Sequence, residues 1–394
     1  MAPPDSDAAG PEKPASDLLH LGQSHESHGE LFAALACYNR AIAHLIALAE
    51  TESPDDAIGR ERMPIDEFGP LSSSHGRVGR LLAIAWMNRG NALQKFHVLR
   101  GTYSEAAVAA YDQTISLLEP LAVAAPADHA LRNSLGAAYL NRAGALLGGH
   151  EAGPSDRPED LDFLRRDADS SARAALDSAD RAIATLVTLP LDENISHRAN
   201  LAGAHLNRAS ALLCNGERRH LAAARASACL ALDLTVATAE NHLAFAHVSL
   251  GARHALLAIV GRELSAPDRD AAGLLAEAGD VVDAGLALAR RWERRCGTAF
   301  RPAAAQLFYT GAILYASYQP HFLAEFLDEN HVLARERPAL VEAILTRARR
   351  TAHERCLVAN SAEPLSRTFH TLTDLSAIAD RLAGPGPTGV PALP

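Results

Sequence analysis

The chain is rich in small apolar residues that do not alternate one by one with polar residues. Alternation of that kind is the pattern of a half-buried strand, and no segment has it. Alanine has the highest helix propensity of all residues, so an alanine-rich chain without alternation favours helices throughout. The pattern therefore predicts an all-α fold before any motif is considered.

One six-residue motif recurs four times along the chain and indicates that these helices form a repeat. Three copies combine a small residue, a ring-bearing residue, an apolar residue, Asn and Arg, and the fourth is looser: Ala85–Gly90, Ala138–Ala143, Ala204–Ala209 and Thr238–Leu243. Asn207 and Asn241, in the last two copies, lie 34 residues apart. That period is typical of helix–turn–helix repeats, which stack into a superhelix with a groove.

Further positions of the repeat resemble the tetratricopeptide (TPR) family. The first copy has Leu18, Leu21, Gly22 and His25, followed by Ala34, Tyr38 and Ala41, and the second has Trp86, Gly90, Ala92, Tyr103, Ala107 and Tyr111. The second-helix segments Ala34–Ala43 and Ala175–Ala184 also match each other. The chain is similar to a TPR protein of bacterial type. This resemblance implies an α-solenoid of stacked antiparallel helix pairs.

The resemblance has departures with physical consequences. Arg89, Arg142 and Arg208 stand where the family often has leucine. We expect them to be partly buried and paired with acids on adjoining helices, Asp112 and Asp180 being candidates, because an unpaired buried charge is costly. In the fourth copy, Leu221 and Arg225 replace the usual small and aromatic pair, which predicts looser or rearranged helix contacts. Trp86 should lie buried between its own helix pair and the preceding one.

Proline and glycine divide the chain into segments. Residues 1–16 and 384–394 are expected to be disordered tails. Residues 17–269 hold the TPR-like repeats, with insertions at 51–80 and 148–169. Residues 270–383 form a C-terminal helical extension or cap, with helices expected at about 270–295, 302–318, 320–334, 337–358 and 364–383.

Charge and cysteine content narrow the function. The net charge of −10 argues against general nucleic-acid binding, although arginines outnumber acids over residues 285–360. Five cysteines without a Cys-x-x-Cys pattern favour reduced thiols over disulfides or a zinc site. The first residues lack the features of a secretory signal, and no apolar run reaches 18 residues without a charge or turn. We therefore expect a cytoplasmic protein without a membrane-spanning helix.

Catalytic and metal-binding signals are poor. The two histidines of His25-Glu26-Ser27-His28 are one residue too close for a helical metal site with a glutamate between them. His321 and Glu325 lie one helical turn apart, but a solvated helix face explains them better. Phosphate-binding loops and the nucleophile elbow are missing from the sequence. We expect a non-enzyme with no cofactor and no metal.

The groove of the helix stack is the favoured binding site. Asn88, Asn141, Asn207 and Asn241 occupy one equivalent position of the repeat, with His20 matching them in the first copy. Members of the family use groove asparagines to bind extended peptides, which suits an amide that both donates and accepts. The alternative is that each Asn bonds a neighbouring helix. The predicted peptide-binding residues are Asn88, Asn91, Asn141, Asn207, Ser210, Asn241, Met87, Leu140 and Leu206.

A second surface is considered in the aromatic-rich C-terminal segment. Phe308, Tyr315 and Phe322 form a possible docking surface, although a buried terminal cap is the favoured explanation. The sequence thus predicts an adaptor or scaffold that binds a protein or peptide partner. Two alternatives stay open: a regulatory sensor with an enclosed pocket for a small molecule or peptide, and a nucleic-acid accessory protein that uses the C-terminal arginines. The partner, its pathway and the oligomeric state are not determined by the sequence.

Overall fold

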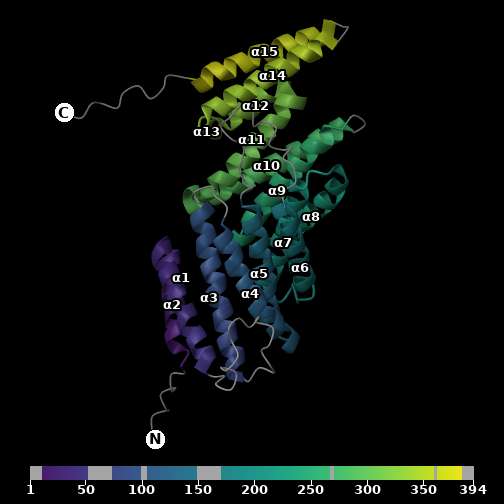
Figure 1. Cartoon of the computed structure of the whole chain (residues 1–394). Helices are drawn as coiled ribbons and strands as arrows, with labels where there is room; N and C mark the ends of the chain where they lie inside the picture. Colours follow the sequence, from purple (N-terminus) through teal and green to yellow (C-terminus); the bar gives the residue numbers. More distant parts are fainter. Residues whose placement is uncertain are drawn as a thin grey trace, which may run out of the picture. The chain divides into compact units, whose positions relative to one another are not determined.

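Residues 11–51, 73–98, 104–148, 170–266, 270–358 and 362–383 are described by the computed structural model of the chain. Helices joined by short turns fill these ranges, and none of their residues forms a strand (Figure 1). The predicted all-α fold class is confirmed. Two compact units divide the chain, one ending at Ala211 and the other beginning, among the described residues, at Leu212.

The first unit is a stack of helix pairs. Its helices are α1 (Lys13–Ser27), α2 (Leu31–Thr51), α3 (Ser73–Val98), α4 (Glu105–Ala124), α5 (His129–Leu147), α6 (Ser170–Leu186) and α7 (Ile195–Cys214), the last up to Ala211. Helices α1 and α2, α3 and α4, and α5 and α6 pack as consecutive pairs, and α2 and α4 also pack on the pair that follows each (Figure 1). This arrangement confirms the predicted α-solenoid.

The second unit contains the remaining helices. They are η4 (Arg218–His220), α8 (Leu221–Thr235), α9 (Leu243–Leu264), α10 (Ala271–Cys296), η5 (Gly297–Phe300), α11 (Arg301–Tyr318), α12 (Pro320–Glu329), α13 (His331–Ala334), α14 (Pro338–Val358) and α15 (Ala362–Ala383). The five predicted C-terminal helices are confirmed, except that the one expected over 320–334 is split. Asn330 ends α12 there, because its side-chain amide donates to the Phe326 carbonyl at 2.8 Å and accepts from Arg290 at 2.6 Å.

Two irregular segments are shorter than the sequence suggested. Helix α1 begins at Lys13, inside the predicted 1–16 tail, because Pro14 lies in its first turn, where a missing N–H costs no hydrogen bond. Helix α3 begins at Ser73, inside the predicted 51–80 insertion. Thr51, at its start, belongs to α2, and residues 52–72 of that insertion, residues 149–169 of the second one and the 384–394 tail lie outside the described residues. The division at residue 269 stays a prediction.

Glycine and tyrosine interlock within the first two pairs. A Cβ atom on Gly22 of α1 would lie 2.4 Å from Cε1 of Tyr38 on α2, and one on Gly90 of α3 would lie 2.7 Å from Cε1 of Tyr111 on α4. Both tyrosines are fully buried. Each ring therefore fills the space that the opposing glycine leaves, which brings the two helix backbones close together.

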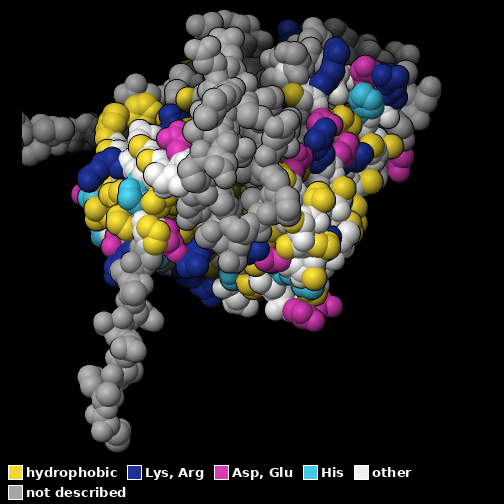
Figure 2. All heavy atoms as spheres, turned by 60° about the horizontal axis from the view of Figure 1, so that its bottom comes forward, with side chains coloured by type: hydrophobic (Ala, Val, Ile, Leu, Met, Phe, Trp, Pro, Cys, Tyr) yellow, Lys and Arg dark blue, Asp and Glu magenta, His cyan; other side chains and the backbone are white. Residues whose placement is uncertain are grey.

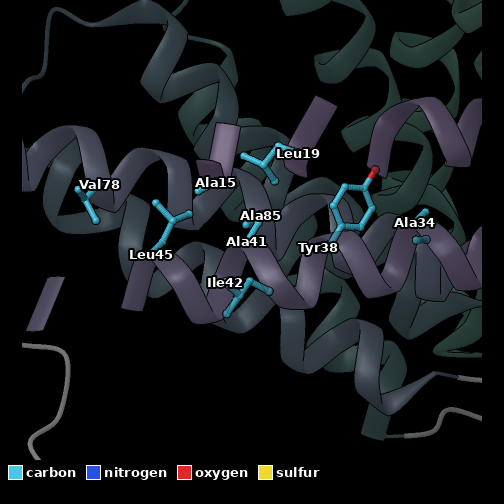
Figure 3. Close-up of a cluster of buried hydrophobic side chains, with 10 residues drawn as sticks. Ala15, Leu19, Ala34, Tyr38, Ala41, Ile42, Leu45, Val78 and Ala85 are labelled. Carbon is cyan, nitrogen blue, oxygen red and sulfur yellow. The ribbon is translucent and has the colours of Figure 1, made fainter. Parts of the chain in front are cut away.

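The first core cluster joins three helices. Leu19 of α1, Tyr38 and Leu45 of α2, and Ala85 of α3 belong to it, and Figure 3 shows these side chains converging between the helices. Trp86 packs against this cluster and is partly buried. The expected contact of Trp86 with the preceding pair is thus confirmed, and the Arg89 guanidinium lies over the indole ring, 5.3 Å from its centroid.

The interlock predicts a position-specific sensitivity to added methyl groups. Gly90→Ala should lower the free energy of unfolding by about 1–3 kcal/mol, because the new methyl overlaps the buried Tyr111 ring. Gly79→Ala, in the same helix, is the matched control: its Cβ would lie 3.7 Å from Leu121, an ordinary contact. Urea denaturation followed by circular dichroism measures both variants. Equal stability of the two would show that the interlock does not restrain the pair.

Arginines link each pair to the preceding one. Arg142 of α5 donates through Nε to Asp112 of α4 at 2.6 Å, and Arg208 of α7 does the same to Asp180 of α6 at 2.7 Å. The two predicted ion pairs are confirmed. Arg89 differs, because residue 39 of α2 is asparagine: its Nε donates to the Asn39 side-chain oxygen at 2.9 Å. The same bridge thus recurs at three junctions, twice as an ion pair.

The ion pair between Arg142 and Asp112 should contribute modestly to the free energy of unfolding, and its contribution should depend on salt. The Arg142 side chain is 23% exposed and Asp112 is 49% exposed, so solvent screens the pair. A double-mutant cycle with Arg142→Gln and Asp112→Asn should give a coupling energy of about 0.5–1 kcal/mol that falls as salt is added. A coupling energy indifferent to salt would contradict the ionic origin of the bridge.

The second unit replaces the tyrosine with charge. Arg225 of α8, at the position that holds tyrosine in the first two repeats, pairs with Glu263 of α9 and Glu277 of α10. Glu263 is buried, so the pair brings ionic groups into the helix interface. The rearranged contact predicted for this repeat is therefore an ion cluster across three helices.

A histidine also lies inside this unit. His254 of α9 contacts the hydroxyl of the buried Thr310 on α11 at 3.2 Å. Burial lowers the pKa of His254 to about 4, so its imidazole is neutral near pH 7.

Acid should weaken the fold through His254. The unfolded chain binds a proton near the ordinary pKa of 6.5, whereas the folded protein resists protonation down to about 4, so the free energy of unfolding falls as the pH drops across this window. The loss should be on the order of 3 kcal/mol, since one pKa unit corresponds to about 1.4 kcal/mol. His254→Gln should show a shallower decline in denaturation curves recorded at several pH values. Parallel declines for variant and wild type would refute the assignment.

Candidate functional site

The candidate site is a row of amide side chains on the first helices of successive pairs. We define the amide row as Asn91 and Gln94 on α3, Asn133 and Asn141 on α5, and Asn200 and Asn207 on α7. Spacings of three, eight and seven residues place each couple on one face of its helix. All six residues are partly buried, so they border a surface instead of lying in the core.

Direct hydrogen bonds connect the amide row across helices. Asn141 donates to the side-chain oxygen of Asn91 at 3.1 Å, and Asn200 donates to that of Asn133 at 3.0 Å. Asn207 donates to the backbone carbonyl of Leu140 at 2.9 Å. The row therefore ties α3 to α5 and α5 to α7, which is the neighbour-bonding role considered from the sequence.

A buried tyrosine orients the α3 end of the row. The Tyr111 hydroxyl lies 2.9 Å from the side-chain oxygens of both Asn91 and Gln94, and donates toward them. Burial, and secondarily the charge of Glu26, raise the pKa of Tyr111, so the hydroxyl keeps its proton. Since both oxygens face Tyr111, the Gln94 amide nitrogen points away from that hydroxyl.

The amide row keeps hydrogen-bonding capacity that its contacts within the described chain do not use. The side-chain oxygens of Asn141 and Asn207 and the Gln94 nitrogen have no partner among the described residues, and the neighbouring Asn88 nitrogen is buried without one. An amide has two donors and an acceptor with two lone pairs. No residue of the row carries a formal charge. The row thus offers neutral donors and acceptors side by side.

Most predicted groove residues lie beside this row. Eight of the predicted residues lie on the same three helices as the row, and all eight are partly buried. They are Met87, Asn88 and Asn91 on α3, Leu140 and Asn141 on α5, and Leu206, Asn207 and Ser210 on α7. His20, on α1, is exposed. Sequence reasoning missed Gln94, Asn133 and Asn200. Their spacings of three, eight and seven residues from Asn91, Asn141 and Asn207 could have indicated that each couple lies on one helix face.

Asn241 does not belong to this surface, which corrects the sequence prediction. It is exposed in the turn between α8 and α9, because α9 begins only at Leu243. Helix α10 holds that turn: the Trp292 indole donates to the Ala239 carbonyl at 2.8 Å, and Arg291 pairs with Glu240 at 2.6 Å. The 34-residue spacing therefore led to a turn and not to an equivalent helix position.

The three aromatic residues considered as a possible docking surface differ in their exposure. Phe308 is fully buried, and its ring stacks on Phe326 at a centroid distance of 5.3 Å. Tyr315 is partly buried against the same Phe326 ring, and Phe322 alone of the three is substantially exposed, at 45%. Helix α11, which carries Phe308 and Tyr315, packs against α9, α10, α12 and α14. These contacts favour the cap interpretation.

Other candidate chemistry is sparse in the described part of the chain. The described His, Cys, Asp and Glu residues form no group of three or more that is placed to hold a metal ion. His25 bonds Glu30 at 2.5 Å, and His28 bonds the Ser24 carbonyl. On the face shown in Figure 2, coloured side chains of both charges are interspersed with apolar ones, so no single sign dominates that face.

Two described helices, α2 and α9, are long and apolar enough to cross a membrane by composition alone. Both pack against neighbouring helices in the structure: α2 against α1 and α3, and α9 against α8, α10 and α11. Core helices of folded domains meet the same criterion, so this is weak support for a membrane segment.

Neither a protein-family model nor a curated protein sequence matches the chain. Helix pairs in register, with a small residue of the first helix against a large one of the second, decide the architecture. The fold is a TPR-like helical repeat.

Solved structures similar to the chain include two helical-repeat examples. One is a circular tandem repeat protein with novel repeat topology and enhanced subunit contact surfaces, at 13% identity over 94% of this chain and 89% of that one, with a TM-score of 0.28. The other is the TPR domain of P58(IPK), at 15% identity over 93% of this chain and 98% of that one, with a TM-score of 0.16. Similarities this low do not indicate a function, and the fold assignment depends on the packing of the chain itself.

Proposed function

We propose that the protein is a non-enzymatic adaptor that binds an extended, uncharged segment of a partner protein. The binding surface would be the first-helix face, by which we mean the surface of α3, α5 and α7 that carries the amide row. The amide row supports this proposal, because its members keep free donors and acceptors after bonding one another. A peptide main chain presents N–H and C=O groups in alternation, and a side-chain amide can bond either kind.

The composition of the face favours a neutral ligand. Its polar groups are amides, and its apolar members, Met87, Leu140 and Leu206, offer contacts for uncharged side chains. Each neutral hydrogen bond contributes on the order of 1 kcal/mol, so affinity would come from several bonds acting together. Binding of this kind should depend little on salt, unlike binding driven by ion pairs.

A cytoplasmic location is part of the same proposal. Cys37, Cys229 and Cys296 are free thiols. Free thiols suit a reducing compartment, which supports a cytoplasmic location. The bacterial type is inferred from the resemblance of the repeat alone.

The proposal is tested with the full chain and a display library of random peptides. Peptides enriched on the wild-type protein are synthesised with both ends capped, and their affinities are measured by fluorescence anisotropy. The double variant Asn141→Ala, Asn207→Ala should bind them at least tenfold more weakly, because it removes two amides of the face. Alanine favours helix, so circular dichroism should show an intact fold.

Gln113→Ala is the matched control, because this exposed amide lies on the second helix α4, away from the amide row. It should bind like wild type. If the library yields no enriched peptide, or if the double variant folds and binds like wild type, the first-helix face is not the binding site.

A further inference from the structure

Two amide nitrogens from different helices converge above one glycine of the first-helix face. A Cβ atom on Gly144 of α5 would lie 3.5 Å from Nε2 of Gln94 on α3 and 3.5 Å from Nδ2 of Asn207 on α7. We call these three residues the amide cradle. Helix α5 lies between the two donors, so both nitrogens approach the same stretch of bare backbone.

Both donors have hydrogens to offer there. Asn207 uses one N–H on the Leu140 carbonyl and keeps the other. The Gln94 oxygen faces the Tyr111 hydroxyl, which leaves both hydrogens of its nitrogen free of partners among the described residues. The buried tyrosine and the Leu140 carbonyl therefore hold the two amides in a fixed orientation, ready to donate.

The packing of the free protein does not require glycine at position 144. A methyl group there would make only ordinary contacts at 3.5 Å, whereas one on Gly22, Gly90 or Gly136 would overlap a neighbouring side chain at 2.4–2.7 Å. Glycine is also less favourable than alanine inside a helix. Gly144 is partly exposed, and a glycine at such a position lets a ligand backbone approach the helix closely.

We propose that the amide cradle is a carbonyl-oxygen subsite that selects the bound segment. A main-chain carbonyl of the ligand accepts hydrogen bonds from Gln94 and Asn207, and the ligand residue facing Gly144 is small, because its backbone lies against α5. This inference rests on the proposed peptide binding and adds its specificity: an uncharged segment with Gly, Ala or Ser at one fixed position. Neutral donors on both sides favour a carbonyl over a carboxylate, whose charge they would not neutralise.

Gly144→Ala gives the sharpest test, because it should separate stability from binding. The methyl fits the free protein, so the variant should melt no earlier than wild type, yet it occupies the space between the two donors. The capped peptides enriched on the wild-type protein should bind it on the order of tenfold more weakly. Gly79→Ala, which makes the same change on α3 toward Leu121, should bind like wild type.

Two further measurements complete the test. Gln94→Met removes one donor at similar size and should also weaken binding severalfold, and adding Gly144→Ala to it should cost less than the two separate losses multiplied, because both act on one oxygen. The enriched sequences should share a small residue at one position and lack acidic residues there.

The outcomes distinguish the cradle from the wider proposal. If Gly144→Ala binds like wild type while the Asn141→Ala, Asn207→Ala variant loses binding, the subsite is wrong and the peptide-binding face stands. Enriched peptides that need a free terminal carboxylate would replace the carbonyl with a carboxylate and overturn the subsite. Wild-type binding by every variant, or the absence of any enriched peptide, would overturn both.

Discussion

The contact between Gly90 and the buried ring of Tyr111 supports both the packing and the surface of the first unit. The glycine lets α3 and α4 approach closely enough for the ring to be fully enclosed. The hydroxyl at the end of that ring then reaches Asn91 and Gln94. One packing interaction thus fixes the distance between two helices and the orientation of two amides. Gly22 and Tyr38 repeat the packing, but there the hydroxyl donates to Glu26 at 2.8 Å.

Different interactions hold the two helices of a pair together and hold neighbouring pairs together. Apolar burial and close packing hold each helix pair, and they require shape complementarity in the core. Between pairs, Arg142 and Arg208 bond aspartates of the preceding pair, and asparagines bond across the first helices. These polar bonds are directional and individually modest. They set the register of neighbouring pairs while leaving amide groups free at the surface.

The second unit follows the same repeat with other chemistry. Arg225 bonds Glu263 and Glu277 where the first two repeats bury a tyrosine. The Phe308 ring on α11 contacts the rings of Tyr309 and of Phe326 on α12, and α14 packs against both helices. Most of these aromatic side chains are therefore buried in the core of the second unit, whereas the first unit has amide groups without partners among the described residues on its first-helix face.

The sequence alone determined the helices, their pairing and two bridges between pairs. Periodic small residues and alanine content act locally or between adjacent helices, so the helix assignments and the Arg142–Asp112 and Arg208–Asp180 contacts followed from spacing. Asn88, Asn141 and Asn207 lie on the helices α3, α5 and α7, and their role in binding stays a prediction.

Only the tertiary structure decided which residues are buried and which side chains from distant helices meet. Asn241 has the right period but lies in a turn, because Trp292 and Arg291 of α10 hold the chain before α9 begins. Phe308 belongs to an aromatic group that looked like a possible surface, yet several helices enclose it. Gln94 and Gly144 were overlooked, since the convergence of Gln94 with Asn207 depends on three helices that are distant in sequence. Burial and the meeting of side chains from separate helices are properties of the packed chain, and local pattern carries no information about them.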